Sequence, residues 1–216
     1  MADAPMNICW LDLETTNADE NTGSIVEIGA IVTDPDLREV EEISLLVLPE
    51  PDHWEEMPPV VQRMHEASGL ADAIEDAMAQ PDRADALDVR EADRILRAFL
   101  DRHAVSGRVI LAGSGVSHFD HRWIRLHLPR SAKRLTWWAW DVGNVRRFLG
   151  SIDEALLRPS PADKAHRGIV DARDHLNEWR YYRAMVREAI TPLRVASARE
   201  SRALVDVLAP EAVEEG

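Results

Sequence analysis

The chain has 216 residues, of which 45% are hydrophobic and 30% charged, proportions typical of one soluble globular domain. Its apolar runs are too short to cross a membrane, and its one cysteine, Cys9, excludes an internal disulfide. The net charge of −14 argues against a protein that grips long duplex nucleic acid, which usually needs a basic surface. We expect a cytoplasmic protein, because the N-terminus lacks a basic start followed by an apolar run.

The first part of the chain reads as three β-strands followed by short helices. Residues 7–13 and 25–34 are rich in Ile, Val and Trp, and a polar loop separates them. A third strand over 42–48 is closed by a proline pair that begins at Pro49. Proline is tolerated in a first helical turn, so 58–65 could form a short helix before an alanine-rich helix at 72–80.

The rest of the chain alternates helix and strand. Apolar residues at helical spacing predict a helix over 88–103. Ser117 is a candidate N-cap for a helix that ends at Leu128, before Pro129. Further elements are expected at 108–112 (strand), 136–142 (strand), 144–150 (helix) and 168–190 (long helix). This order predicts an α/β fold, with a mixed sheet flanked by helices.

The domain organisation and the charge distribution are both uneven. Residues 1–190 are expected to form one domain, and residues 191–216 a C-terminal helix and an acidic tail. From Arg122 to Arg147 the chain carries seven basic residues and a single acid, Asp141. One local basic strip on an acidic protein suits short substrates better than long ones. The alternative is a solvated acidic surface with ordinary surface arginines.

Four carboxylates and a histidine indicate a reaction. Asp12 and Glu14 stand two positions apart in the first strand and therefore point to the same face. Asp120 lies early in a predicted helix, and His166 precedes Asp171 by five residues at a loop-to-helix junction. Carboxylate clusters suit hard ions such as Mg²⁺ or Mn²⁺, and two such ions promote phosphodiester hydrolysis. Each residue also has an ordinary alternative: hydrated acids at a strand end, an acid at a helix N-terminus and a surface histidine.

The order and spacing of these residues resemble the DEDDh family of 3′→5′ exonucleases, in particular its oligoribonuclease members. Flanking segments are similar too, at 25–34 (IVEIGAIVTD), 64–70 (MHEASGL), 140–142 (WDV) and 180–183 (RYYR). The resemblance implies a ribonuclease H-like fold with five strands, two Mg²⁺ or Mn²⁺ ions, short single-stranded RNA as substrate, and a homodimer. It implies that Asp12, Glu14 and Asp171 hold one ion, that Asp12 bridges to a second near Asp120, and that His166 is the general base.

The same resemblance suggests substrate contacts at Leu13, Thr15, His65 and Trp137. His65 is similar to a family histidine that contacts the nucleotide phosphate, although a helix-end histidine held by the backbone is an alternative. Trp137 and its neighbouring tryptophans could stack on bases, or they could belong to the core or to a dimer interface. His175, one turn beyond Asp171, is expected to be structural.

Three positions depart from the oligoribonuclease pattern. Val60 stands where those enzymes have a tryptophan, Ala18 lies in the stretch of their leucine wedge, and Trp138 replaces an arginine. These departures predict a broader range of substrate lengths than a strict dinucleotidase has. Two other functions stay open on sequence alone: a proofreading-type exonuclease that acts on DNA, and a nuclease fold kept as a binding module.

Overall fold

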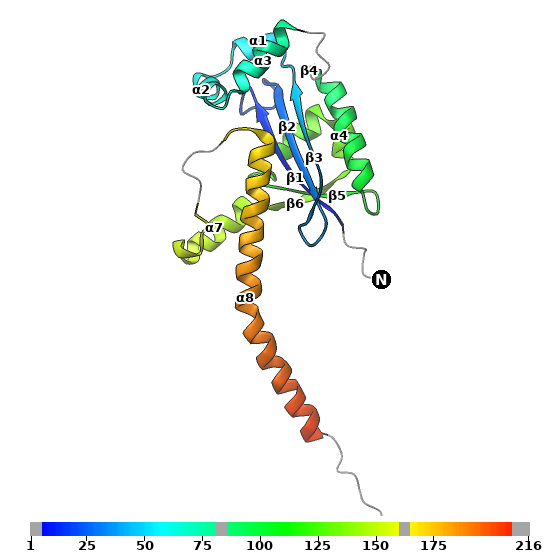
Figure 1. Cartoon of the computed structure of the whole chain (residues 1–216), viewed down its shortest axis with the longest axis vertical. Coiled ribbons are helices and arrows are strands. Elements are labelled where there is room, and N and C mark those ends of the chain that lie inside the picture. Colours follow the sequence, from blue (N-terminus) through cyan, green and yellow to red (C-terminus); the bar gives the residue numbers. More distant parts are fainter. Residues whose placement is uncertain (1–5, 81–85, 160–164, 209–216) are drawn as a thin grey trace, which may run out of the picture. The chain divides into compact units, whose positions relative to one another are not determined.

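A computed structural model describes residues 6–80, 86–159 and 165–208. The chain divides into two compact units, Met1–Glu178 and Trp179–Gly216. The first unit holds the sheet and the helices around it (Figure 1). The described part of the second unit continues the last helix, α8 (Gly168–Leu208). The domain boundary expected near residue 190 stays a prediction, and the expected acidic tail lies outside the described residues from 209 onward.

Six strands form one mixed sheet in the order β4-β3-β2-β1-β5-β6. Strand β2 is antiparallel to β1 and β3, whereas β1, β5 and β6 run parallel to one another. The strands are β1 (Ile8–Thr15), β2 (Ile25–Thr33), β3 (Glu39–Val47), β4 (Ala86–Leu87), β5 (Val109–Gly113) and β6 (Leu135–Asp141). The mixed sheet is confirmed, but the expected count of five strands is wrong by one. Strand β4 has only two residues, too few to leave a sequence pattern, and it pairs parallel with the end of β3.

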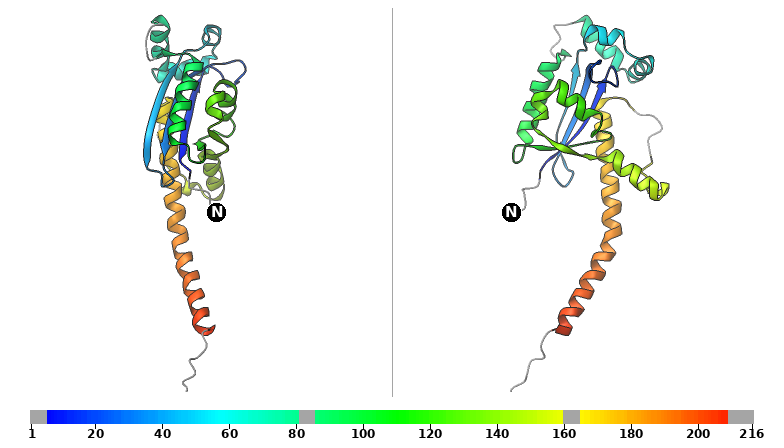
Figure 2. Two further views of the ribbon diagram at one scale, coloured as in Figure 1. Left: turned by 90° about the vertical axis from the view of Figure 1, so that its right-hand side faces the viewer. Right: turned by 180° about the vertical axis from the view of Figure 1, so that it is seen from behind.

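The two faces of β1 are covered by different helices. Leu11 and Leu13 point into the main core, which α4 and α5 close from the other side. Because side chains alternate along a strand, the two carboxylates of β1 point to the opposite face. There the start of α8 lies so close to β2 that a Cβ on Gly29 would fall 2.0 Å from the carbonyl carbon of Gly168. Figure 1 shows the first turns of α8, up to Glu178, in front of the sheet, and the view from behind in Figure 2 brings α4 and α5 to the front.

The helices follow the sequence pattern where it is long and periodic. They are α1 (Pro51–Glu55), α2 (Pro59–Ala67), α3 (Leu70–Ala79), α4 (Val89–His103), α5 (Asp120–His127), α6 (Pro129–Ala132), α7 (Val142–Ile152), a 3₁₀ turn (Glu154–Leu156) and α8. The helix predicted over 88–103 is confirmed as α4. Asp88 caps it by accepting hydrogen bonds from the amides of Arg90 and Glu91, which would otherwise lack partners.

Predictions based on single turn-forming residues are less accurate. Pro51 and Pro129 each begin a helix, α1 and α6, that the sequence did not predict. Proline suits a first helical turn because its φ is already helical and its missing amide has no helical partner there. Ser117 is not the cap of α5. The helix begins at Asp120, and the amide of Ser117 instead donates to the side chain of Asp141, at the end of β6.

Candidate active site

Strand β1 presents two carboxylates on the face that α8 covers. The antiparallel ladder places Glu14 directly opposite Glu27 of β2, so these two side chains are neighbours on that face. Glu14 is 5% exposed and Glu27 is 1% exposed, and Asp12 lies two residues before Glu14. Three acidic groups on one buried surface repel one another unless cationic groups lie among them. A positive charge beside them, or protonation of one of them, relieves this repulsion.

Asp120, the first residue of α5, is tied to β1 between the two carboxylates. Its Oδ1 accepts a 3.0 Å hydrogen bond from the amide of Leu13, the residue between Asp12 and Glu14. Burial raises the pKa of the Asp120 carboxyl from 3.8 to about 7. Hydrogen bonds from backbone amides oppose this rise, because they favour the charged form. A cation bound beside Asp120 would oppose this effect of burial and favour the carboxylate.

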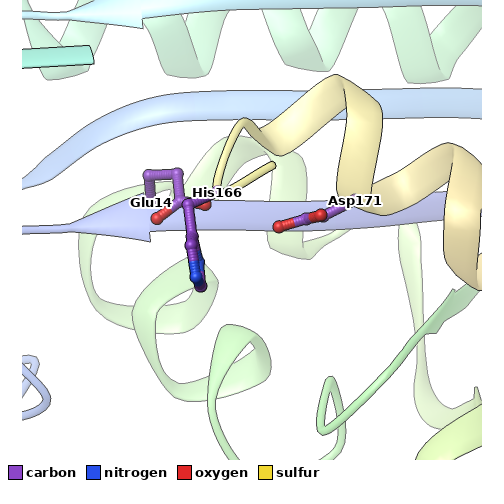
Figure 3. Close-up of side chains that lie close together, drawn as sticks. All are labelled: Glu14, His166 and Asp171. Carbon is purple, nitrogen blue, oxygen red and sulfur yellow. The ribbon is translucent and has the colours of Figure 1, made fainter. Parts of the chain in front are cut away.

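The start of α8 supplies the remaining groups. Among the residues that the structure describes, Glu14, His166 and Asp171 form one group whose ligand atoms all lie within 4.8 Å of one another. Figure 3 shows Glu14 on β1, His166 on the segment that leads into α8, and Asp171 within the helix. His166 has a φ of 48°, in the left-handed region that is uncommon for residues other than glycine. Such a conformation persists where surrounding contacts hold it.

Two residues that sequence reasoning did not assign supply charge and contacts here. The guanidinium of Arg167 forms an ion pair with Glu27, with 2.8 Å between Nη2 and Oε1. Its hydrogen bond to Glu27 raises the pKa of Arg167, and the nearby charge of Glu14 adds to the effect. The sequence carries a weak signal for this pair: Glu27 is the only charged residue in an otherwise buried, mostly apolar strand, and Arg167 directly follows His166.

Two buried histidines lie beside β1. The Nδ1 atom of His175 is 3.8 Å from Oδ1 of Asp12, and the ring is buried, in keeping with the structural role expected for it. His65 of α2 is fully buried, and its Nε2 lies 3.0 Å from the carbonyl oxygen of Thr15. Burial lowers the pKa of His65 and so favours the neutral ring. This hydrogen bond is the arrangement of the backbone-held alternative for His65, and contact with a nucleotide phosphate stays a prediction.

A pocket opens beside Glu14 at the end of β1. It is lined by Leu13, Glu14, Thr15, Asn17, Ala18, Val61, Met64 and Phe119. Two of the predicted substrate contacts, Leu13 and Thr15, are therefore in its wall. Trp137 is not, since it lies on the edge strand β6, where it is 79% exposed. Sequence reasoning gave no substrate role to Val61 and Met64 of α2 or to Phe119 before α5, two segments that are far apart in the chain.

The donor set fits divalent cations that prefer oxygen. Carboxylates predominate, and no cysteine takes part, because the only one, Cys9, is buried in the core on the other face of β1. Mg²⁺ and Mn²⁺ favour such oxygen-rich sites, whereas structural zinc sites use cysteine and histidine. The buried Asp120 carboxyl, with its raised pKa, is a group whose charged form a cation would stabilise.

Comparison with known proteins agrees with this geometry. The family model described as "Exonuclease" matches residues 9–178. An oligoribonuclease of Rhodococcus jostii is 28% identical over 94% of this chain and 98% of its own length. An oligoribonuclease of Corynebacterium glutamicum is 30% identical over 94% of this chain and 90% of its own length.

Solved structures of exonuclease I have a similar fold. A product-bound exonuclease I gives a TM-score of 0.62 at 13% identity, over 84% of this chain and 44% of that chain. The exonuclease I of Methylocaldum szegediense gives a TM-score of 0.56 at 17% identity, over 83% of this chain and 40% of that chain. At these identities the likeness shows the fold alone, and this chain spans less than half the length of those proteins.

Proposed function

The chain belongs to the exonuclease family as an oligoribonuclease-like, metal-dependent 3′→5′ phosphodiester hydrolase, and we propose that it degrades short single-stranded RNA to nucleoside 5′-monophosphates. The observation that carries this proposal is the convergence of Glu14, His166 and Asp171 from β1 and α8. Two carboxylates and a histidine at one point match what hydrolysis of a phosphodiester needs.

The carboxylates are the groups that would hold two Mg²⁺ or Mn²⁺ ions. We assign Asp12, Glu14 and Asp171 to one ion, and Asp12 together with Asp120 to the second. When bound, such ions stabilise the charge that develops on the attacking and leaving oxygens. The protein's own contribution is placement, since the hydrogen bond from the Leu13 amide fixes Asp120 against β1.

His166 is the proposed general base. A ring nitrogen of His166 takes the proton of the attacking water and later returns it to solvent. Glu14 and Asp171 lie close enough to stabilise the positive charge that this transfer creates on the ring. The position of His166 just before α8 keeps the ring at the site without making it part of the helix.

The pocket beside Glu14 is the proposed seat of the 3′ nucleotide. The apolar side chains of Val61, Met64 and Phe119 suit the faces of a base and a sugar, while Thr15 offers polar contacts. His65, fully buried under Thr15, is assigned to support this wall. Discrimination between RNA and DNA would rest on contacts to the 2′-hydroxyl in this pocket.

We also propose that the protein is a homodimer. Trp137 is 79% exposed and Trp138 is 39% exposed, both on β6, an edge strand of the sheet. Large exposed aromatic side chains are typical of protein interfaces. Light scattering after size exclusion should give twice the chain mass, and Trp137→Arg should give the monomer. A cytoplasmic location stays a prediction.

The central test is hydrolysis of labelled oligonucleotides. The purified protein is incubated with RNA and DNA oligomers of matched sequence, with Mg²⁺, with Mn²⁺ or with a chelator. We expect stepwise shortening of RNA from the 3′ end, release of 5′-monophosphates, no activity with the chelator, and none for Asp171→Asn. Shortening from the 5′ end, or equal activity of Asp171→Asn, would overturn the proposal. Faster hydrolysis of DNA would assign the chain to the alternative substrate.

A further inference from the structure

An ion pair between the buried Glu27 and the half-buried Arg167 holds the backbone next to the proposed general base. Glu27 accepts hydrogen bonds from Arg167, with Nε at 3.1 Å and Nη2 at 2.8 Å from Oε1. Its other oxygen, Oε2, accepts a 2.6 Å hydrogen bond from the amide of Gly168. One carboxylate thus binds both the side chain of one residue and the backbone of the next. It ties β2 to a segment about 140 positions away in the chain.

The backbone contact between β2 and α8 restricts the same segment. A Cβ on Gly29 would lie 2.0 Å from the carbonyl carbon of Gly168 and 2.1 Å from the amide nitrogen of Ile169. A Cβ on Gly168 would lie 2.8 Å from the amide nitrogen of Gly29. The two backbones therefore meet without side chains between them. Residues 167 and 168 are fixed to the sheet by charge, by a hydrogen bond and by direct packing.

His166 comes immediately before this fixed segment. Its left-handed backbone, with φ of 48°, needs external contacts to persist. The contacts of Arg167 and Gly168 with Glu27 directly follow His166 in the chain and can provide them. The ion pair also affects the charge beside Glu14. Because Arg167 balances the charge of Glu27, Glu27 adds little to the repulsion among the carboxylates of the site.

We propose that Glu27 and Arg167 are positioning residues, which hold His166 in place for proton transfer. This inference rests on the proposed role of His166. A misplacement of about 1 Å can cost about a hundredfold in rate. Loss of the pair should therefore lower kcat strongly, while KM and cation affinity change little, because neither residue is among the proposed ligands.

The experiment compares Arg167→Gln, Arg167→Lys and Glu27→Gln with the native enzyme. The control is Arg102→Gln, which makes the same chemical change in an exposed ion pair with Glu41. We expect Arg167→Gln and Glu27→Gln to lower kcat by about a hundredfold, with Mn²⁺ affinity by calorimetry close to that of the control. Arg167→Lys should keep part of the rate, since lysine keeps the charge but cannot form the same paired hydrogen bonds.

A double-variant comparison separates positioning from general structural support. In a His166→Ala background the pair has no base left to place, so adding Arg167→Gln should change kcat little. An equal loss in both backgrounds would mean that the pair only stabilises the fold. If the native enzyme cleaves RNA but Arg167→Gln keeps its full rate, this inference fails while the proposed function stands.

A measurement without substrate gives an independent answer. In nuclear magnetic resonance spectra, Glu27→Gln should move the His166 ring signals and speed hydrogen exchange at the Gly168 amide, relative to Arg102→Gln. Unchanged ring signals with a protected Gly168 amide would overturn the proposal whatever the activity of the native protein.

Discussion

His166 stands beside Glu14 and Asp171, and its chemistry can be separated from ion binding. We predict that His166→Ala lowers kcat by about 10²–10⁴-fold, the contribution of a typical general base. Mn²⁺ affinity should change little, because the carboxylates supply the proposed ligands. The checks are rate against pH and calorimetric titration with Mn²⁺. The native profile should rise with pH and the variant should lack that rise. A variant that keeps it would place the proton on a group other than His166.

Asp120 predicts a pH dependence of stability in the protein without bound cations. Its folded pKa of about 7 exceeds the ordinary value of 3.8, so the folded state binds the proton more tightly. This contribution to the free energy of unfolding is full below pH 3.8 and is lost as the pH rises through about 7. With a chelator present, the melting temperature should therefore fall from about pH 5 to about pH 8.

Asp120→Asn is the matched variant for that prediction. Asparagine keeps an oxygen that can accept the hydrogen bond of the Leu13 amide but carries no titrating proton. The variant should lose less stability than the native protein over the same pH range. Parallel curves for the two proteins would contradict the assignment. Addition of Mn²⁺ at the higher pH should raise the melting temperature of the native protein more than that of the variant.

Residues that carry charge in a recognisable order could be predicted from the sequence, and residues that act through partners could not. Asp12 and Glu14 follow strand periodicity, and the spacing of His166 and Asp171 marks a helix start. The pairing of Glu27 with Arg167 joins positions about 140 residues apart, and nothing in either local pattern names the other. The burial of His65 beside Thr15 depends equally on tertiary packing.

At the scale of secondary structure, the contact between β2 and α8 sets the geometry of the site. We predict that Gly29→Ala destabilises the protein by about 1–3 kcal/mol or more, since the added methyl overlaps the backbone of Gly168. Gly150→Ala is the control, because there the new Cβ meets only the flexible side chain of Leu157, at 3.4 Å. In helix α7 this change should stabilise by about 0.5–1 kcal/mol. The measurement is denaturant unfolding of both variants and the native protein. If Gly29→Ala were as stable as the native protein, the tight contact between β2 and α8 would be disproved.

Elements with a long apolar pattern were predictable, because burial imposes the pattern. Strand β2 is buried along its whole length, and α4 buries one face, with Ala92, Leu96 and Phe99 at helical spacing. The two-residue strand β4 and the four-residue helix α6 are too short to carry a period, and backbone pairing or capping alone defines them. Asp93 illustrates the second case: it accepts hydrogen bonds from the amides of Arg130 and Ser131 at the start of α6, from a helix far away in sequence.

At the scale of the whole molecule, the charge of −14 limits how nucleic acid can bind. Long polyanions gain affinity mainly by releasing counterions from many phosphate contacts, which an acidic surface does not offer. A short oligomer has few phosphates, so it loses little affinity on an acidic surface, and its binding depends more on the pocket beside Glu14. Affinity should therefore come from enclosure of the terminal nucleotides.

The walls of that pocket predict the range of substrate lengths. In the wall, Ala18 and Val61 are small. Outside it, Val60 of α2 is 64% exposed, and Trp138 of β6 takes the place of an arginine in the resemblance to oligoribonucleases, so the bidentate phosphate contact that an arginine can form is missing there. Without a large side chain to close the pocket after two nucleotides, longer oligomers should enter.

We accordingly predict that kcat/KM on RNAs of two, three, five and seven nucleotides varies by less than about tenfold, a difference of about 1.4 kcal/mol in transition-state binding. A 5′-phosphate should matter little, since tryptophan cannot form a bidentate phosphate contact. The measurement is steady-state kinetics on each length with and without the 5′-phosphate. Val60→Trp is the matched variant, and it should shift the preference toward the dinucleotide if α2 borders the path of the chain. A native preference of about a hundredfold or more for the phosphorylated dinucleotide would mean that other residues of this protein close the pocket and bind the 5′-phosphate, because that ratio needs about 2.7 kcal/mol of specific contact.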